Sequence, residues 1–147
     1  MSDQFPKALT DYVAGLESHD VEKIASTLSD DLMFISATRV MNKSEALVML
    51  GALYTAFPDW RYEYDEIENR GQNNFAIKWR QGGTHNGAWN LPGMDGIAPT
   101  GKQVRITPHY FYYRVANERL SIIFPEPVVG GAPRGILEQI GANVPPL

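Results

Sequence analysis

The feature that most constrains the fold of this chain is a change of hydrophobic period near residue 58. Before that point, apolar side chains recur every three or four residues, which is the spacing of amphipathic helices. After it, large apolar residues alternate with charged or polar ones, as they do in half-buried strands. Helices followed by a run of strands predict an α+β fold. We expect a strongly curved antiparallel sheet wrapped around one buried helix, with an internal cavity between them.

The helical part of the sequence predicts three helices. Residues 5–16 carry apolar side chains at helical spacing, and Asp20 is well placed to cap a second helix over residues 21–28. Asp30 and Asp31 interrupt that pattern, and the apolar residues after them are typical of a short strand over residues 32–37.

The third helix has clear end signals and an unusual composition. Asn42 followed by Glu45 resembles a capping box, and Pro58 disfavours helix at Phe57. Residues 46–54 are apolar nearly all round the helix, which predicts burial on more than one side.

The second part of the chain predicts strands and one last helix. Strands are expected over residues 60–67, 75–79, 104–115 and 120–124. Proline and glycine make residues 90–100 a loop that should reach over one end of the sheet. Residues 134–140 predict a short helix that Gly141 ends.

Composition excludes several classes of protein. With 147 residues, residues 1–147 are expected to form one domain. The net charge is −4 and the 13 basic residues are scattered, so we expect no nucleic-acid partner. There is no cysteine, no signal-peptide pattern and no apolar run long enough to span a membrane. We therefore expect a soluble, cytoplasmic protein without a membrane partner.

Two histidines lie close to glycines or aromatic residues in the strand region. His85 stands in the sequence Gly-Gly-Thr-His-Asn-Gly at the expected exit of one strand, where backbone can approach a ligand closely. His109 lies in a later strand and is followed by Tyr110, Phe111, Tyr112 and Tyr113. Imidazoles among aromatic side chains are typical of an apolar pocket with a few polar groups, so we expect a hydrophobic small-molecule ligand.

At these residues the sequence resembles the SnoaL-like polyketide cyclases, a family within the cone-shaped NTF2-like fold that also includes ketosteroid isomerases. The matching segments run in order along nearly the whole chain: residues 29–32, 57–60, Trp79, 83–87, 97–102, 113–115 and 137–141. The resemblance implies an NTF2-like cone and an enzyme that closes rings in polyketide-like carbonyl compounds.

The chain also departs from the pattern of that family. Members that close polyketide rings are similar in carrying an aspartate three residues before a strand arginine and a histidine two residues earlier. Here Arg114 is the arginine, His109 keeps the histidine position, and Phe111 occupies the acid position. A phenyl ring cannot move a proton. The family's tryptophan in the last strand is replaced by Phe124, which leaves Glu126 as the nearest carboxylate.

The candidate catalytic residues are His85, His109 and Glu126. Imidazole titrates near neutral pH and can serve as an acid or a base toward a carbonyl compound. The alternatives are that His85 fixes the following loop, that His109 is a hydrogen-bonded core residue, and that Glu126 is an exposed turn residue. Candidate substrate-binding residues are Tyr12, Phe34, Trp60, Trp79, Tyr110, Phe111 and Tyr112. Isolated histidines and the lack of a phosphate-binding glycine motif lead us to expect no metal and no cofactor.

Three functions remain open at this point. The first is a cofactor-independent cyclase or isomerase that removes a proton next to a carbonyl group. The second is a binding module that keeps the fold and holds an apolar ligand without chemistry, and the third is a dimerisation domain with a filled cavity. We also expect a homodimer, because aromatic residues in 60–67 and 75–79 would be left on the outer face of one curved sheet.

Overall fold

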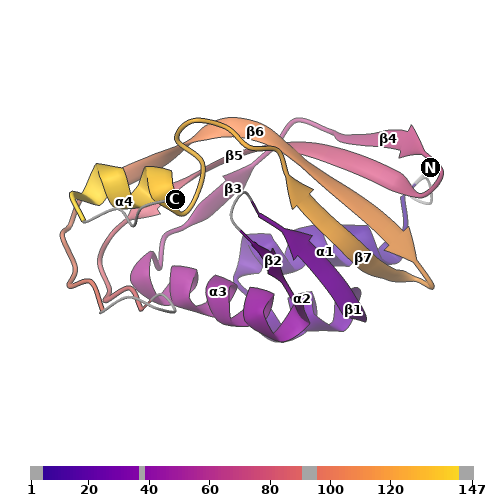
Figure 1. Cartoon of the computed structure of the whole chain (residues 1–147), viewed down its shortest axis with the longest axis horizontal. Helices are drawn as coiled ribbons and strands as arrows, with labels where there is room; N and C mark the ends of the chain where they lie inside the picture. Colours follow the sequence, from indigo (N-terminus) through magenta and orange to yellow (C-terminus); the bar gives the residue numbers. More distant parts are fainter. Residues whose placement is uncertain (1–4, 37–38, 91–95, 143–147) are drawn as a thin grey trace.

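A computed structural model describes residues 5–36, 39–90 and 96–142 of the chain (Figure 1). Residues 91–95, which belong to the expected loop over residues 90–100, lie outside the described residues. The elements of the described part follow one another as α1 (Lys7–Ser18), α2 (Val21–Thr27), β1 (Leu28–Ile35), β2 (Val40–Met41), α3 (Lys43–Ala56), β3 (Arg61–Glu63), β4 (Ile67–Gly71), β5 (Asn74–Thr84), β6 (Gln103–Ala116), β7 (Arg119–Pro125) and α4 (Arg134–Ile140).

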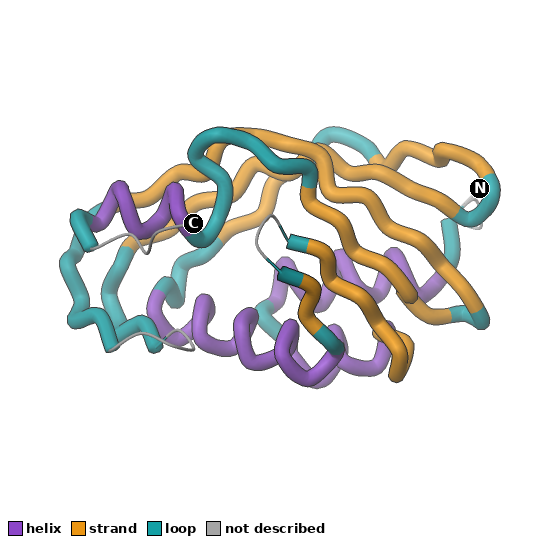
Figure 2. Tube along the Cα trace, in the orientation of Figure 1, coloured by secondary structure: helices purple, strands orange, loops and turns teal. Residues whose placement is uncertain are grey.

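The strands form one curved, open sheet, which confirms the α+β prediction. Its order is β2-β1-β7-β6-β5-β3, and β4 pairs with the free part of the β5 edge. Every pair is antiparallel except β1 with β7, which is parallel. The sheet arches over α1, α2 and α3, and α4 lies at the opposite end from the β4–β5 turn (Figures 1 and 2).

The helix ends form as the local sequence predicts. The side chain of Asp20 accepts a hydrogen bond from the backbone N–H of Lys23 at 3.0 Å. At the start of α3, Asn42 and Glu45 form a complete capping box, which satisfies two backbone donors that the helix leaves free. Gly141 ends α4 with φ +76°, a left-handed conformation that glycine adopts without a steric penalty.

Helix α3 packs against the core along most of its length, as its apolar composition predicts. Ala46, Leu50 and Ala56 are buried, and Tyr54 is partly buried against both core clusters. The helix contacts β1 and β2 of the sheet and also contacts α2. Val48 is 58% exposed, so the prediction of burial on more than one side does not hold at this position.

Several strand boundaries also differ from the sequence predictions. The expected strand over residues 60–67 is split into β3 and β4, with Tyr64, Asp65 and Glu66 between them. β1 starts at Leu28 and includes both aspartates, because a bulge with three extra residues lies between Leu28, which pairs with Leu120, and Met33, which pairs with Ile122. The two-residue strand β2 was not predicted.

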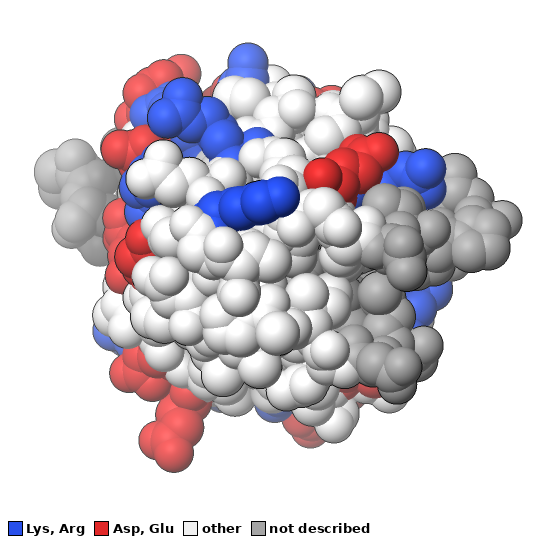
Figure 3. All heavy atoms as spheres, turned by 90° about the vertical axis from the view of Figure 1, so that its left-hand side faces the viewer, with Lys and Arg blue, Asp and Glu red and all other residues white. Residues whose placement is uncertain are grey.

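The buried side chains form two clusters on the helix-facing side of the sheet, which we call the inner face. The larger cluster joins α1 and α3 to β1, β5, β6 and β7. The smaller one joins the end of α3 to α4 and the start of β6. Figure 3 shows the α4 end of the molecule, where charged side chains lie mainly toward the margins. In the described residues, no helix is both long and apolar enough to cross a membrane.

Candidate functional site

Strand β6 divides the predicted site residues between the two faces of the sheet. Phe111 packs against the larger cluster on the inner face, and His109 lies two residues before it on the same face. Tyr110 and Tyr112 lie on the opposite, outer face, where the Arg70 guanidinium stands 5.4 Å and 5.9 Å from their ring centroids. Because side chains alternate along a strand, these two tyrosines cannot line the same pocket as His109.

The other predicted binding residues are on the inner face but are tightly packed. Tyr12, Phe34, Trp60 and Trp79 are between 1% and 6% exposed. The indole N–H of Trp79 donates to the Tyr113 hydroxyl at 2.8 Å. The aromatics on which the expected dimer contact rested, Trp60 and Trp79 among them, are therefore core residues, and that reason for a dimer is wrong.

His109 is buried and its tautomer is fixed by the backbone. Its Nδ1 lies 2.8 Å from the carbonyl oxygen of Thr107. A carbonyl can only accept, so Nδ1 carries the proton and donates it, and in the neutral ring Nε2 holds a free electron pair. The ring centroid lies 5.0 Å from that of Phe111. This arrangement makes Nε2 of His109 a base beside an apolar ring.

A β-bulge places His109. Trp79 of β5 pairs with His109, but the next paired residue, Gln81, faces Ile106, so β6 has two residues where β5 has one. Thr107 and Pro108 together face the single residue Arg80 and bend the strand, and the carbonyl of Thr107 is the one that holds the imidazole. Bulges of this kind are common beside functional sites because they re-aim a side chain.

Glu126 lies at the edge of the same region. Its Oε1 accepts a hydrogen bond from the backbone N–H of Tyr110 at 2.9 Å, and its own N–H donates to the Tyr110 carbonyl at 2.9 Å. That amide nitrogen of Tyr110 is bonded to the carbonyl carbon of His109. The half-buried Glu126 carboxylate therefore lies beside the peptide bond that joins His109 to Tyr110. The backbone hydrogen bond between Glu126 and Tyr110 extends the pairing of β6 with β7 by one residue.

His85 is completely buried and ties two segments together. Its Nδ1 accepts the backbone N–H of Thr100 at 3.2 Å and lies 3.0 Å from that residue's hydroxyl. Its backbone bonds to Gly101 and Lys102, and its ring lies 5.2 Å from that of Phe57. Burial lowers the pKa of His85 below the ordinary histidine value, while the backbone of Gly87 acts in the opposite direction. Its Nε2 has no hydrogen-bond partner within the described residues.

The structure does not bring the two candidate histidines together. His109 pairs with Trp79, and His85 lies six residues further along the chain that forms β5. At the rise of a β-strand this separation is about 20 Å. The two imidazoles therefore cannot act on the same bond of a small substrate.

The sequence reasoning missed a polar group near the junction of the two core clusters. The hydroxyls of Tyr54 and Tyr62 lie 2.7 Å apart, and the ring of His19 stacks on Tyr54 at 4.1 Å. Burial raises the pKa of both tyrosines well above the ordinary value, so both stay protonated. His19, which looks like a surface residue in the sequence, donates from Nε2 to the carbonyl of Trp60 at 2.6 Å. Of these three residues, only Tyr62 could have been found from the sequence, because it lies in the alternating pattern of residues 60–67.

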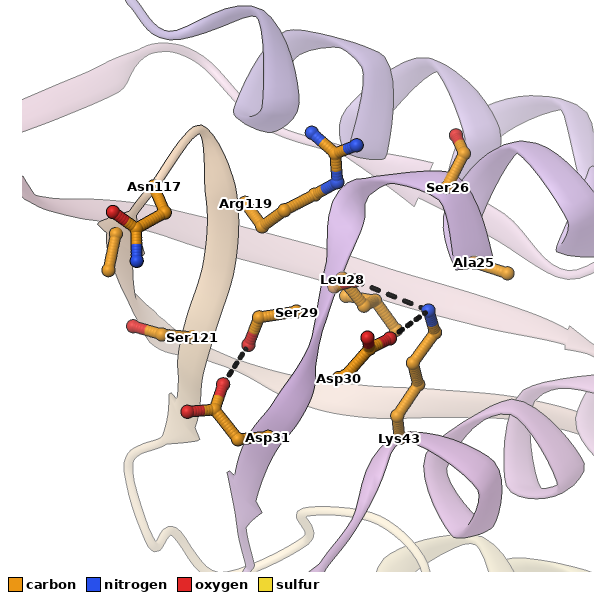
Figure 4. A pocket seen from close by; sticks show the side chains of 11 residues that line it. Ala25, Ser26, Leu28, Ser29, Asp30, Asp31, Lys43, Asn117, Arg119 and Ser121 are labelled. Carbon is orange, nitrogen blue, oxygen red and sulfur yellow. Dashed lines mark hydrogen bonds and ion pairs between the residues drawn. The ribbon is translucent and has the colours of Figure 1, made fainter.

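A polar hollow of about 430 Å³ lies away from these residues, between the end of α2, the bulge of β1, the start of α3 and the β6–β7 turn (Figure 4). Its charges are partly paired: Nζ of Lys43 donates to the Leu28 carbonyl at 3.3 Å and pairs with Asp30 at 3.5 Å, and Ser29 donates to Asp31 at 2.8 Å. None of the predicted site residues lines this hollow. Within the described part of the chain, no cluster of three or more metal-ligating side chains is found.

Solved structures with the same fold come from several bacteria. The candidate hydroxylase AclR from Streptomyces galilaeus has a TM-score of 0.72 at 20% identity, over 94% of this chain and 82% of its own. A candidate SnoaL-like polyketide cyclase from Jannaschia sp. CCS1 has a TM-score of 0.70 at 14% identity, over 97% of both chains. IdmH, a candidate polyketide cyclase from Streptomyces antibioticus, has a TM-score of 0.65 at 17% identity, over 92% and 96%. At such identities these likenesses show the fold alone.

Sequence comparison is more specific. Among curated proteins, none matches this sequence. The family model described as SnoaL-like polyketide cyclase matches residues 7–121, which include α1 to β6 and the start of β7. The chain therefore belongs to the SnoaL-like polyketide cyclase family.

Proposed function

We propose that this protein is an acid/base enzyme that cyclises or isomerises a hydrophobic, polyketide-like carbonyl compound, with His109 as the base. Its family supports a cyclase or isomerase type of activity. The observation that carries the assignment to His109 is the hydrogen bond from Nδ1 to the Thr107 carbonyl, which leaves Nε2 free to accept a proton.

The proposed reaction needs only proton transfer and one new carbon–carbon bond. Nε2 of His109 takes a proton from the carbon next to a carbonyl group, and the electron pair stays on the resulting enolate. The enolate carbon bonds to a second carbonyl of the same molecule, whose π electrons move to its oxygen. That oxygen then takes the proton back from the imidazolium. No electrons are gained or lost, and no external reactant is consumed.

The surroundings of His109 suit this chemistry in an apolar setting. The Phe111 ring, 5.0 Å away, limits the access of water to the imidazole, which strengthens electrostatic interactions there. We assign Glu126 a positioning role, because its Oε1 is held by the Tyr110 N–H next to His109. His85 is assigned to holding the loop, because its Nδ1 is already bonded to Thr100.

The assignment can be tested without knowing the natural substrate. We would incubate the protein with aryl-substituted 1,5-diketones in D2O and follow by NMR both α-proton exchange and ring closure. His109→Gln should slow exchange by about 10²- to 10⁴-fold, the usual contribution of a general base. Lys78→Gln is the matched control, because Lys78 lies on the outer face of the neighbouring strand and should leave the rate unchanged.

The same experiment separates the enzyme from the binding module. The observation that favours a binding module is Phe111, an apolar ring packed into the core at the acid position of the family. If wild-type protein binds the diketones, as seen by quenching of tryptophan fluorescence, but exchanges no protons above the buffer rate, the binding module is correct. Equal exchange rates in wild type and His109→Gln would remove His109 from the mechanism.

We further propose that the protein forms a homodimer through an apolar strip on the outer face of the sheet. The strip consists of Met33, Ile35, Val40, Ile122 and Phe124. Val40 pairs with Ile35 and Ile122 with Met33, so these side chains adjoin across β2, β1 and β7. Met33 and Val40 are 45% and 56% exposed. Exposed apolar patches that span several strands commonly mark a protein contact.

Light scattering at micromolar concentration tests the dimer. Wild type should have twice the monomer mass, and Met33→Glu should reduce it to that of a monomer. Val48→Glu is the matched control, since Val48 is equally apolar and exposed but lies on α3, on the other side of the molecule. A monomeric wild type would contradict the proposal.

The cytoplasmic location expected from the sequence stays a prediction.

A further inference from the structure

A second hollow, on the outer face of the sheet, is lined by three arginines. Its volume is about 250 Å³, and it is lined by Arg61, Glu63, Arg80, Gln81, Arg105, Ile106 and Pro108. We propose that this arginine hollow binds a small, multiply charged anion that bears phosphate or carboxylate groups. The site is separate from His109, which faces the other side of the sheet.

The strand register brings two of the arginines to either side of a glycine. Arg61 of β3 pairs with Gly82 of β5, and Gly82 pairs with Arg105 of β6, so the three residues form one row across the sheet. Neighbouring strands lie about 4.8 Å apart, which puts the two arginine backbones about 10 Å from each other. Side chains as long as arginine can converge on one anion across that gap.

Gly82 leaves room for the Arg61 side chain between β3 and β6. A Cβ atom at this position would lie 3.3 Å from Nη2 of Arg61 and only 2.6 Å from the carbonyl oxygen of Val104. The Arg61 guanidinium therefore lies close over the glycine backbone. Any larger residue would displace both the arginine and the neighbouring strand.

Arg61 and Arg105 face outward because their neighbours along the strands face inward. Tyr62 packs against Trp79 on the inner face, so the flanking Arg61 points away from it. Val104 and Ile106 are 3% and 2% exposed in the smaller core cluster, so Arg105 between them also points outward.

The protein balances only part of the positive charge of the hollow. Among the described residues, neither Arg61 nor Arg105 forms an ion pair, and Arg80 pairs with Asp65 at 3.2 Å. Glu63, which lies across from Arg80, is the one carboxylate in the lining. Three guanidinium groups therefore face two carboxylates, Glu63 and Asp65, and the remaining positive charge favours an anionic ligand, although the chain as a whole has a net charge of −4.

The backbone under the hollow is held in place from both sides. The side-chain amide of Gln139 in α4 donates to the Arg105 carbonyl and accepts from its N–H, both at 2.8 Å. Pro108 belongs to the bulge of β6 and restricts the backbone there. Because this backbone is already fixed, it loses little conformational entropy when a ligand binds.

The size and exposure of the hollow narrow the class of ligand. At about 250 Å³ it is below the usual range for pockets that hold drug-sized molecules, so it suits a compact anion. Arg61 and Arg105 are exposed, and single exposed ion pairs contribute little to binding. The ligand therefore needs several negative groups, each forming forked hydrogen bonds with a guanidinium.

The test is a titration of the full chain with pyrophosphate and, separately, with citrate, at constant ionic strength, followed by amide NMR. We expect saturable chemical-shift changes at the backbone N–H groups of Arg61, Gly82 and Arg105 with at least one of the two anions. The anion that binds more tightly identifies phosphate or carboxylate as the preferred group. The double variant Arg61→Gln/Arg105→Gln should weaken binding at least tenfold.

A matched control removes two positive charges elsewhere on the outer face. Lys78→Gln/Arg114→Gln has the same net charge as the double arginine variant but leaves the hollow intact, and it should bind as wild type does. Equal weakening in both double variants would mean that binding is only diffuse attraction and would overturn the proposal. The absence of saturable shifts with either anion would overturn it as well.

Discussion

Replacing His85 separates a structural role from a catalytic one. The wild-type ring is fully buried, accepts the Thr100 N–H and stacks on Phe57. His85→Ala removes a hydrogen bond worth about 1 kcal/mol and a stacking contact worth about 1 kcal/mol. It also leaves a small cavity at a cost of roughly 1–2 kcal/mol. We therefore expect a loss of about 3 kcal/mol, a large share of the 5–15 kcal/mol that usually stabilises a domain.

His85→Asn is the informative companion variant. The oxygen of asparagine can occupy the position of the imidazole Nδ1 and accept the Thr100 N–H, although it cannot stack on Phe57. Its loss of stability should be about half that of His85→Ala. Urea unfolding followed by tryptophan fluorescence measures both values, with the slope of the transition used to check that unfolding stays two-state.

The pH dependence of the same variants provides a second measurement. Burial lowers the pKa of His85 in the folded state, so as the pH falls below about 6.5 the unfolded chain takes up a proton that the folded one does not. Wild type should therefore lose stability between pH 7 and pH 5, by up to 1.4 kcal/mol for each unit of pKa depression. Both variants should lack this part of the loss. Variants as stable as wild type, with the same pH slope, would refute the structural role of His85.

Three further changes test other contacts. Asn42→Ala removes the capping box of α3 and should cost about 1 kcal/mol in urea unfolding. Trp79→Phe and Tyr113→Phe each break one buried hydrogen bond, and their double-mutant cycle should give a coupling energy of about 1 kcal/mol; additive effects would contradict it. The Thr84 N–H lowers the pKa of Asp59, so the stability that this carboxylate contributes is present above about pH 4. Wild type should lose it on acidification through the folded-state pKa, and Asp59→Asn should lack that loss in unfolding curves measured from pH 5 to pH 2.

Local signals explain why most of the fold could be predicted from the sequence. The capping residues Asp20 and Asn42 act through neighbours three positions away, so the helix starts are encoded within one turn. Gly141 ends α4 for the same local reason. No local pattern predicts the bulge at Thr107 and Pro108, because it exists only where these two residues of β6 face a single residue of β5.

The candidate site was predicted less well because its members depend on contacts between distant segments. Alternation within β6 could have placed Tyr110 and Tyr112 on the face opposite His109, so that error was avoidable. The stacking of His19 on Tyr54 could not be foreseen, because it joins the end of α1 to the end of α3. The separation of His85 from His109 required the register of β5 and β6, which no local pattern reveals.

The parallel pairing of β1 with β7 constrains the order in which a newly synthesised chain can fold. Strands β5, β6 and β7 follow one another in the chain, joined through residues 85–102 and residues 117–118, whereas Leu28 of β1 must wait for Leu120. Contacts between residues so far apart in sequence form slowly, since a long loop must close first. Until β7 leaves the ribosome, β1 has only β2 beside it and keeps an open edge. The N-terminal helices therefore dock on a complete sheet only in the last stage of synthesis, and fragments that end before residue 119 should aggregate.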